Sequence, residues 1–174
     1  MTIDDLLKDK AIKPKEKTEI ISNWILEKSL SIDELIAYAE NQKDPVKATC
    51  IEAIEYATKQ NSNIADETAL TFVTITLTAK APRIKWESAK VIGNIAHLFP
   101  TKLKKSIDNL LINARHEGTV VRWSSAFALG EILKLKTKHN KDLLPSIETI
   151  CEKEEKNSIK KIYLDAIKKT MKQG

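Results

Sequence analysis

The sequence has little of what builds disulfide frameworks, tight turns or membrane spans. Among 174 residues there are only 4 Gly, 5 Pro and 2 Cys, and aromatic residues make up 5%. Few helix breakers and many straight-chain residues favour helix over strand, because straight side chains lose little rotamer freedom in a helix. No run approaches the roughly 18 apolar residues of a membrane helix, and the N-terminal segment MTIDDLLKDK does not read as a signal peptide. We therefore expect an all-helical cytoplasmic protein with no membrane association.

Residues that bind metals or act as nucleophiles are also sparse. Cys50 and Cys151 lie far apart without a metal-ligand neighbour, which predicts buried free thiols rather than a disulfide or zinc site. His97, His116 and His139 are scattered and form no His-x-x-x-His pattern. Glycine-rich phosphate loops and nucleophile elbows are absent from the sequence. The sequence thus predicts no catalytic residues, no metal and no cofactor.

Arginine is scarce too, although the formal charge is +5. The whole excess lies in residues 134–174, which hold 11 Lys and 6 acidic residues, whereas the chain contains only 3 Arg. Few arginines argue against base-specific reading of DNA, where arginine is the favoured side chain. The lysine-rich end has two alternative interpretations: a solvated helix face, or a patch that attracts a polyanion.

What the chain does contain is a repeat. The stretch 82–99, PRIKWESAKVIGNIAHLF, is matched by 119–135, TVVRWSSAFALGEILKL. A β-branched residue followed by a base recurs at 46, 84, 121 and 159, with intervals of 38, 37 and 38 residues: Val46-Lys47, Ile84-Lys85, Val121-Arg122 and Ile159-Lys160. Such a period predicts antiparallel helix pairs that stack into one continuous core.

Start and stop signals divide the chain into these pairs. Pro14 predicts a helix through about Leu30, and Ser31 with Glu34 forms a capping box for the next one. The threonine-rich segment 64–79 could be mistaken for a strand, but its place in the repeat predicts helix. We expect one domain over 1–174 with approximate units 1–30 (N-terminal cap), 31–60, 63–98, 101–136 and 141–173 (C-terminal cap).

The two central units carry a family resemblance. Ala-x-x-Ile-Gly-x-Ile at 89–95 and Ala-x-Ala-Leu-Gly-x-Ile at 126–132, with the period and the repeated base, resemble HEAT repeats of the armadillo-like class. This resemblance implies an all-α, right-handed α-α superhelix of about four to five antiparallel pairs. Glu55 and Lys168 replace the glycines Gly93 and Gly130 in the outer units, where we expect capping repeats with a more polar face.

In HEAT superhelices the second helices of the pairs line the concave surface, so the resemblance implies that a partner binds there. Counted from the repeated β-branched residue, positions 0, 4, 5, 7, 8 and 11 are predicted to form the core face of each helix, and positions 2, 6 and 10 lie opposite. In the central units these positions are Trp86, Lys90, Asn94, Trp123, Phe127 and Glu131. Aromatic and charged side chains on one surface are typical of recognition grooves. We therefore predict a non-catalytic module, or scaffold, that binds a protein or peptide.

Several of these residues have a purely structural alternative. Trp86 and Trp123 share one repeat position, so they could pack between repeats rather than line a groove. Glu87 and Ser124, the residues after the tryptophans, are expected at the surface. The repeated bases are expected to donate hydrogen bonds between repeats: Lys47, Lys85, Arg122 and Lys160.

Nucleic-acid binding is the alternative function. Some alkylpurine DNA glycosylases use a HEAT-like concave face with tryptophans, a carboxylate and an arginine, and Trp86, Glu87, Trp123 and Arg122 are residues of those kinds. The catalytic aspartate of that family has no counterpart in this sequence. HEAT-repeat metal oxygenases bind iron through several His-Glu pairs, whereas this sequence has only His116-Glu117.

Overall fold

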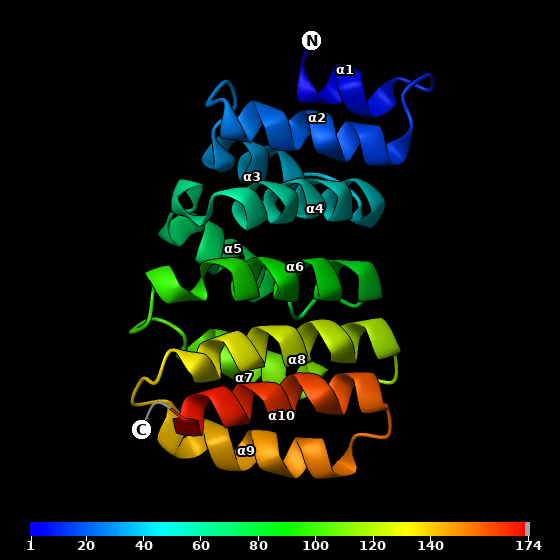
Figure 1. Ribbon diagram of the computed structural model, residues 1–174. Coiled ribbons are helices and arrows are strands. Elements are labelled where there is room, and N and C mark those ends of the chain that lie inside the picture. Colours follow the sequence, from blue (N-terminus) through cyan, green and yellow to red (C-terminus); the bar gives the residue numbers. More distant parts are fainter. Residues whose placement is uncertain (173–174) are drawn as a thin grey trace.

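The chain folds into a stack of paired helices that runs from one terminus to the other (Figure 1). The computed structural model describes residues 1–172, which form ten α-helices, two short 3-10 helices and no strand. The elements are α1 (Ile3–Lys8), α2 (Pro14–Leu26), α3 (Ile32–Glu40), α4 (Asp44–Gln60), η1 (Ser62–Ile64), α5 (Glu67–Thr76), α6 (Pro82–Ile95), η2 (Ala96–Leu98), α7 (Lys104–Asn113), α8 (Thr119–Lys134), α9 (Asn140–Lys153) and α10 (Asn157–Lys172).

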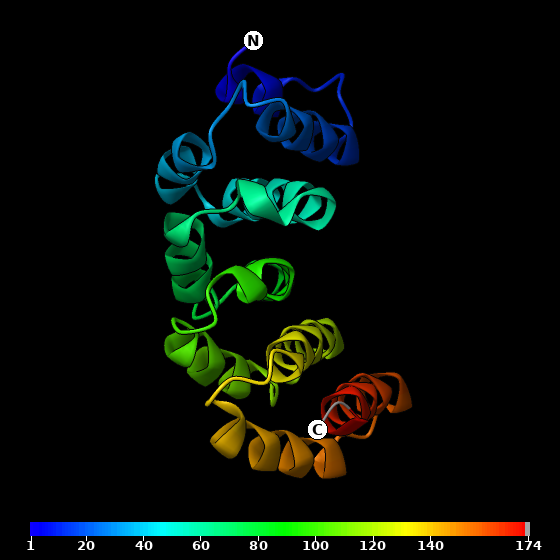
Figure 2. The same ribbon diagram turned by 60° about the vertical axis from the view of Figure 1, so that its left-hand side comes forward.

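The helices form two layers. α2, α4, α6, α8 and α10 lie side by side in one row, and α3, α5 and α7 form the outer layer (Figures 1 and 2). The stack curves so that the row of second helices follows the inside of the arc (Figure 2). The predicted all-helical repeat superhelix is confirmed. We call the surface of α4, α6, α8 and α10 that points away from the outer layer the inner face. The division into units stays a prediction, and its end at residue 173 lies outside the described residues.

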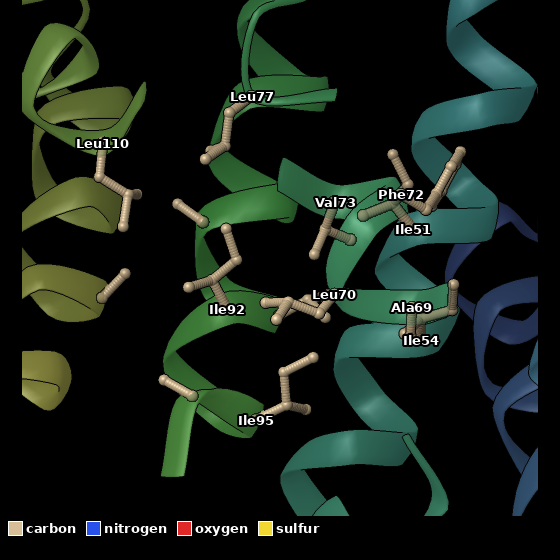
Figure 3. Close-up of a cluster of buried hydrophobic side chains, with 14 of the residues drawn as sticks. Ile51, Ile54, Ala69, Leu70, Phe72, Val73, Leu77, Ile92, Ile95 and Leu110 are labelled. Carbon is tan, nitrogen blue, oxygen red and sulfur yellow. The ribbon is translucent and has the colours of Figure 1, made fainter. Parts of the chain in front are cut away.

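The core runs between the layers along the whole stack. Around the middle, side chains of α4, α5 and α6 meet, including Ile54, Leu70 and Ile92 (Figure 3). The core positions that the repeat predicts in the two central units are all buried: Ile84, Ser88, Ala89, Val91, Ile92 and Ile95, and Val121, Ser125, Ala126, Ala128, Leu129 and Ile132. Stacking therefore buries the apolar stripe that each helix pair leaves open by itself.

Short-range signals set most of the helix starts. Thr2 and Asp5 form a reciprocal capping box at α1, and Ser31 accepts a hydrogen bond from the backbone N of Glu34 at 3.1 Å. Pro82 occupies the first position of α6, where its missing N–H costs nothing. Asp66 caps α5 through the backbone N of Ala69, a start that the repeat pattern alone placed too early, at residue 64.

Two segments differ informatively from the expectation. The helix predicted to reach Leu30 ends at Leu26, because Lys28 adopts a left-handed conformation with φ 64° that no helix can continue. The threonine-rich segment is helical as predicted, and its hydroxyls have interior partners: Thr74 lies 2.7 Å from the Ser106 hydroxyl and Thr76 lies 2.7 Å from that of Ser88. These threonines therefore link neighbouring helices.

Within residues 1–172 none of the helices is long and apolar enough to cross a membrane. Cys50 and Cys151 are both buried free thiols, as predicted.

Candidate partner-binding surface

An aromatic pair lies at the centre of the inner face. Trp123 and Phe127 follow each other by one helical turn on α8, and their rings stack with centroids 6.2 Å apart and an angle of 11° between the planes. Trp123 is 41% exposed, whereas Phe127 is half-buried. Phe127 lies directly over Gly93 of the neighbouring helix α6, where an added Cβ would be 2.3 Å from the Phe127 ring. Because Gly93 has no side chain, the Phe127 ring packs directly on α6. We call this contact the seat of the aromatic pair, because it orients the two rings.

Trp86 is held differently from Trp123, although it occupies the same repeat position. Its ring is half-buried, and its Nε1 donates a hydrogen bond to Oε1 of Glu87 at 2.8 Å. The ammonium of Lys90 donates to the same oxygen at 3.2 Å. Of the two alternatives for the tryptophans, Trp123 is an exposed surface group, whereas Trp86 is partly a packing residue.

The expectation that Glu87 and Ser124 lie at the surface is wrong. Glu87 is 2% exposed and Ser124 is fully buried, because the residue after each tryptophan turns toward the neighbouring helices. Burial raises the pKa of Glu87 more than the nearby charge of Lys90 lowers it. The second carboxylate oxygen of Glu87 has no hydrogen-bond partner among the described residues. Glu87 thus holds the Trp86 indole by a hydrogen bond, although burying its charged carboxylate is unfavourable.

Asn94 and Glu131 extend the face toward the ends of their helices. The Asn94 amide donates to the carbonyl oxygen of Glu55 at 3.2 Å and to the Thr58 hydroxyl at 3.1 Å, so this side chain joins α6 to α4. Glu131 is half-buried and pairs with Lys134 one turn further along α8. Glu131 is partly exposed to solvent, whereas the amide N–H groups of Asn94 already donate hydrogen bonds within the protein.

Carboxylates gather where α4 meets α6. Glu55 is 6% exposed, so its side chain is not the polar outer surface expected of a capping repeat. Burial raises the pKa of Glu55, an effect that the positive charge of Lys90 reduces. Glu52 lies beside it and pairs with Arg83, with 3.4 Å between Arg83 Nη2 and Glu52 Oε2. Lys168, which replaces the other glycine, is exposed.

Two of the four repeated bases, Lys85 and Arg122, are engaged in hydrogen bonds between helices. Lys85 donates to the carbonyl of Leu77 at 3.2 Å and to Oδ1 of Asn113 at 3.1 Å, which ties together three helices as predicted. Hydrogen bonds from the ammonium groups of Lys47 and Lys160 are not found within residues 1–172, so the prediction is confirmed for Lys85 and Arg122 only.

Arg122 closes the junction between α8 and the end of α9. Its guanidinium donates to both carboxylate oxygens of Glu154, at 3.1 and 3.3 Å, and to the carbonyls of His116 and Glu117. Burial alone would raise the pKa of Glu154, but the hydrogen bonds from Arg122 and from the backbone N of Lys156 lower it. Arg122 is therefore committed to repeat packing and does not join Trp86, Trp123 and Glu87 as one group.

Two of the three histidines, His97 and His116, also have local partners. His116 accepts a hydrogen bond from the backbone N of Gly118 at 2.8 Å, and His97 lies 3.2 Å from the Ser62 hydroxyl. Across residues 1–172, no three His, Cys, Asp or Glu side chains come together as a metal site would require.

Comparison with known proteins identifies the fold. No protein-family model matches this sequence, and no curated protein matches it either. Among solved structures, a designed armadillo repeat protein in complex with the peptide (KR)4 is 16% identical, with a TM-score of 0.72 over 97% of this chain and 80% of that chain. A second designed armadillo repeat protein is 14% identical, with a TM-score of 0.73 over 97% of this chain and 80% of that one. A computationally designed armadillo repeat protein for modular peptide recognition is also 14% identical, with a TM-score of 0.73 over 96% and 80%. The chain therefore has an armadillo-like helical repeat fold.

Proposed function

We propose that this protein is a non-catalytic interaction module that binds a protein or peptide segment through its inner face. The observation that carries the proposal is Trp123, a large aromatic side chain that is 41% exposed yet held by its stack on Phe127. A rigid aromatic surface loses little entropy on binding, which is why tryptophan dominates many interfaces.

The neighbours of Trp123 suit a segment that carries both charges. Lys90 and Glu131 flank the aromatic pair on the two central helices, and Glu52 adds a carboxylate on α4. The proposed binding residues are Trp86, Lys90, Asn94, Trp123, Phe127 and Glu131, with the aromatic pair supplying contact area and the charged groups supplying orientation. A solved structure of the same fold is a complex with the peptide (KR)4, which supports a peptide as the kind of partner.

The nucleic-acid alternative gains nothing from the structure. Arg122 is tied to Glu154 and Glu87 is buried, so two of the groups that a glycosylase-like site would use are not presented together. The exposed lysines of α10 remain its only support. A cytoplasmic location is part of the proposal, and two free thiols suit a reducing compartment.

The test is selection of binding peptides from a phage-displayed library of random peptides, followed by affinity measurement with the enriched peptides. We expect Trp123→Ala to weaken binding by about 30-fold or more, since truncating a central aromatic typically costs that much. Ile75→Ala is the matched control, because Ile75 is 62% exposed on the outer helix α5 and truncation there leaves the inner face intact.

Two results would count against the proposal. One is the absence of any enriched peptide; the other is a set of peptides that bind Trp123→Ala and the natural protein equally well. Labelled double-stranded and single-stranded DNA, titrated at low and then physiological salt, forms the second arm. Binding that falls steeply with salt and needs the α10 lysines would favour the nucleic-acid function instead.

A further inference from the structure

Each inner helix has a side that faces the following repeat. The same three repeat positions form it on α4, on α6 with η2, and on α8, and every one of these residues is 2% exposed or less: Ile51, Ile54 and Thr58; Ala89, Ile92 and Ala96; Ala126, Leu129 and Leu133. These nine residues are therefore the surface onto which each next repeat stacks.

Contacts between neighbouring inner helices place the next repeat on this side. The hydroxyl of Thr58 accepts a hydrogen bond from Asn94 on the following inner helix, at 3.1 Å. The carbonyl of Leu133 lies 3.4 Å from the hydroxyl of Thr170 on α10, and a Cβ added to Gly130 would lie 3.2 Å from the Cβ of Ala166. The third of these positions therefore contacts the next inner helix at both ends of the row, and the other two positions lie on the same stripe.

On α10 the same three positions are Leu164, Ile167 and Met171. Their spacing of three and four residues places them in one stripe along the helix. Leu164 is 56% exposed and Met171 is 68% exposed, while Ile167 is half-buried. Helix α10 therefore carries an apolar stripe at the stacking positions that nothing within residues 1–172 covers.

The other end of the stack is closed in the expected way. α1 lies across α2 and buries Leu6 completely, while its outer surface carries the exposed Asp5 and Lys8. Met1 is 77% exposed beside these charges. The charges of α1 complement an apolar stripe poorly, which disfavours head-to-tail stacking of α10 on the first repeat of another copy. Such a contact would also extend without limit into a filament.

The groove beside the stripe is self-complementary. α9 and α10 enclose a hollow of about 290 Å³ at this end, lined by Glu148, Cys151, Glu152, Lys160, Leu164 and Ile167. Its α9 wall carries carboxylates and its α10 wall carries a lysine beside the apolar side chains. A two-fold axis that runs along the groove would set each α10 over the α9 of the other copy, so that opposite charges face each other around a shared apolar centre.

We propose that this end face, formed by Leu164, Ile167, Met171 and the groove between α9 and α10, binds a second copy of the same chain to form a symmetric dimer. In this dimer each copy covers the α10 stripe of the other, as the next repeat covers the corresponding stripe within the chain. The inner face stays open in this arrangement, so the proposal is independent of peptide binding.

The test is the mass of the full chain in solution, measured by sedimentation equilibrium from about 1 µM to about 1 mM, the range in which weak dimers form. We expect the mass to rise from 19.6 kDa toward twice that value. Leu164→Glu places a charge on the apolar centre twice, once from each copy, and should weaken dimerisation by about 100-fold or more. Ile112→Glu is the control, since Ile112 is 70% exposed on the outer helix α7 and its replacement should leave the dimer intact.

A charge exchange tests the orientation of the two copies. Lys160→Glu should weaken the dimer, and adding Glu152→Lys to that variant should restore it, because each lysine would again face a carboxylate across the axis. The circular dichroism of Leu164→Glu should match that of the natural protein, since the replaced side chain is exposed. A monomer over the whole range overturns the proposal, as does a dimer that Leu164→Glu leaves unchanged.

Discussion

Gly93→Ala tests whether the seat of the aromatic pair is as tight as the structure shows. In an exposed helix interior this change stabilises a protein by about 1 kcal/mol, because alanine loses less backbone entropy than glycine. At Gly93 the new methyl group would lie 2.3 Å from Cε2 of Phe127, with two further ring atoms at 2.8 and 2.9 Å. Carbon atoms do not approach so closely, so either the Phe127 ring or the helix α8 has to move.

The ring cannot swing away without loss. Phe127 is stacked on Trp123 and half-buried between α6 and α8, so moving it gives up packing on both sides. Overpacking of this kind typically costs about 1 to 3 kcal/mol. We therefore expect Gly93→Ala to lower the free energy of unfolding by up to about 2 kcal/mol after the helix-propensity gain is included.

Urea unfolding followed by circular dichroism measures this effect, and Phe127→Ala provides the decisive background. Without the ring the clash is gone, so Gly93→Ala should stabilise the Phe127→Ala protein by about 0.5 to 1 kcal/mol. Gly130→Ala serves as the comparison, because its nearest neighbour is the Cβ of Ala166 at 3.2 Å and a shift of a few tenths of an ångström suffices there. The reasoning is refuted if Gly93→Ala is more stable than the natural protein, or if it costs the same with and without Phe127.

Three further predictions concern buried groups. Glu87→Gln should stabilise the protein at pH 7, and this advantage should shrink toward pH 4. Burial raises the pKa of Glu87, so the folded state loses stability as the pH rises above the ordinary carboxyl value of about 4.3. Urea midpoints at several pH values measure the advantage of the variant, and an advantage that grows on acidification would contradict this prediction. Arg122→Ala should cost about 3 kcal/mol at pH 7 by leaving Glu154 buried without its partner. That cost should fall in acid, because Arg122 holds the pKa of Glu154 low and the stability it contributes is lost as the pH falls through that pKa; equal costs at pH 7 and in acid would count against this account. Cys50 should react with a thiol reagent only on unfolding, since it is fully buried and burial raises its pKa to about 12. Fast reaction of Cys50 in the folded protein, located by mass spectrometry, would be the contrary result.

The sequence was sufficient to predict the core because a repeat transfers information between units. Once Ile84 and Val121 were aligned, the burial of one central helix predicted that of the other, and all twelve predicted core positions are buried. The same alignment outweighed the strand propensity of the threonines in α5, which the structure shows as helix with Thr74 and Thr76 bonded to hydroxyls of neighbouring helices.

What the repeat could not predict depends on partners outside the aligned helix. Trp86 and Trp123 share a repeat position, but only Trp86 has a glutamate after it, and that carboxylate fixes the indole. Glu87 looked like a surface residue because its type is polar, whereas its position lies toward the neighbouring helix. The burial of Glu87 could have been inferred from its position next to a predicted core residue, but its charged side chain suggested the surface instead.

The glycine position shows how repeat packing and the proposed binding surface are linked. At Gly93 the Phe127 ring packs from the next inner helix and leaves no room for a side chain. At Glu55, the corresponding residue of α4, Asn94 bonds only the backbone carbonyl, so a side chain fits there. The orientation of Trp123 is in turn set by the ring that Gly93 seats. Gly93→Ala should therefore weaken peptide binding even at temperatures where the variant is fully folded, although Gly93 itself is buried and contacts no partner. If the folded variant binds peptide with the affinity of the natural protein, the Trp123 indole does not depend on the packing of Phe127 against Gly93. The proposed preorganisation of the inner face would then be wrong.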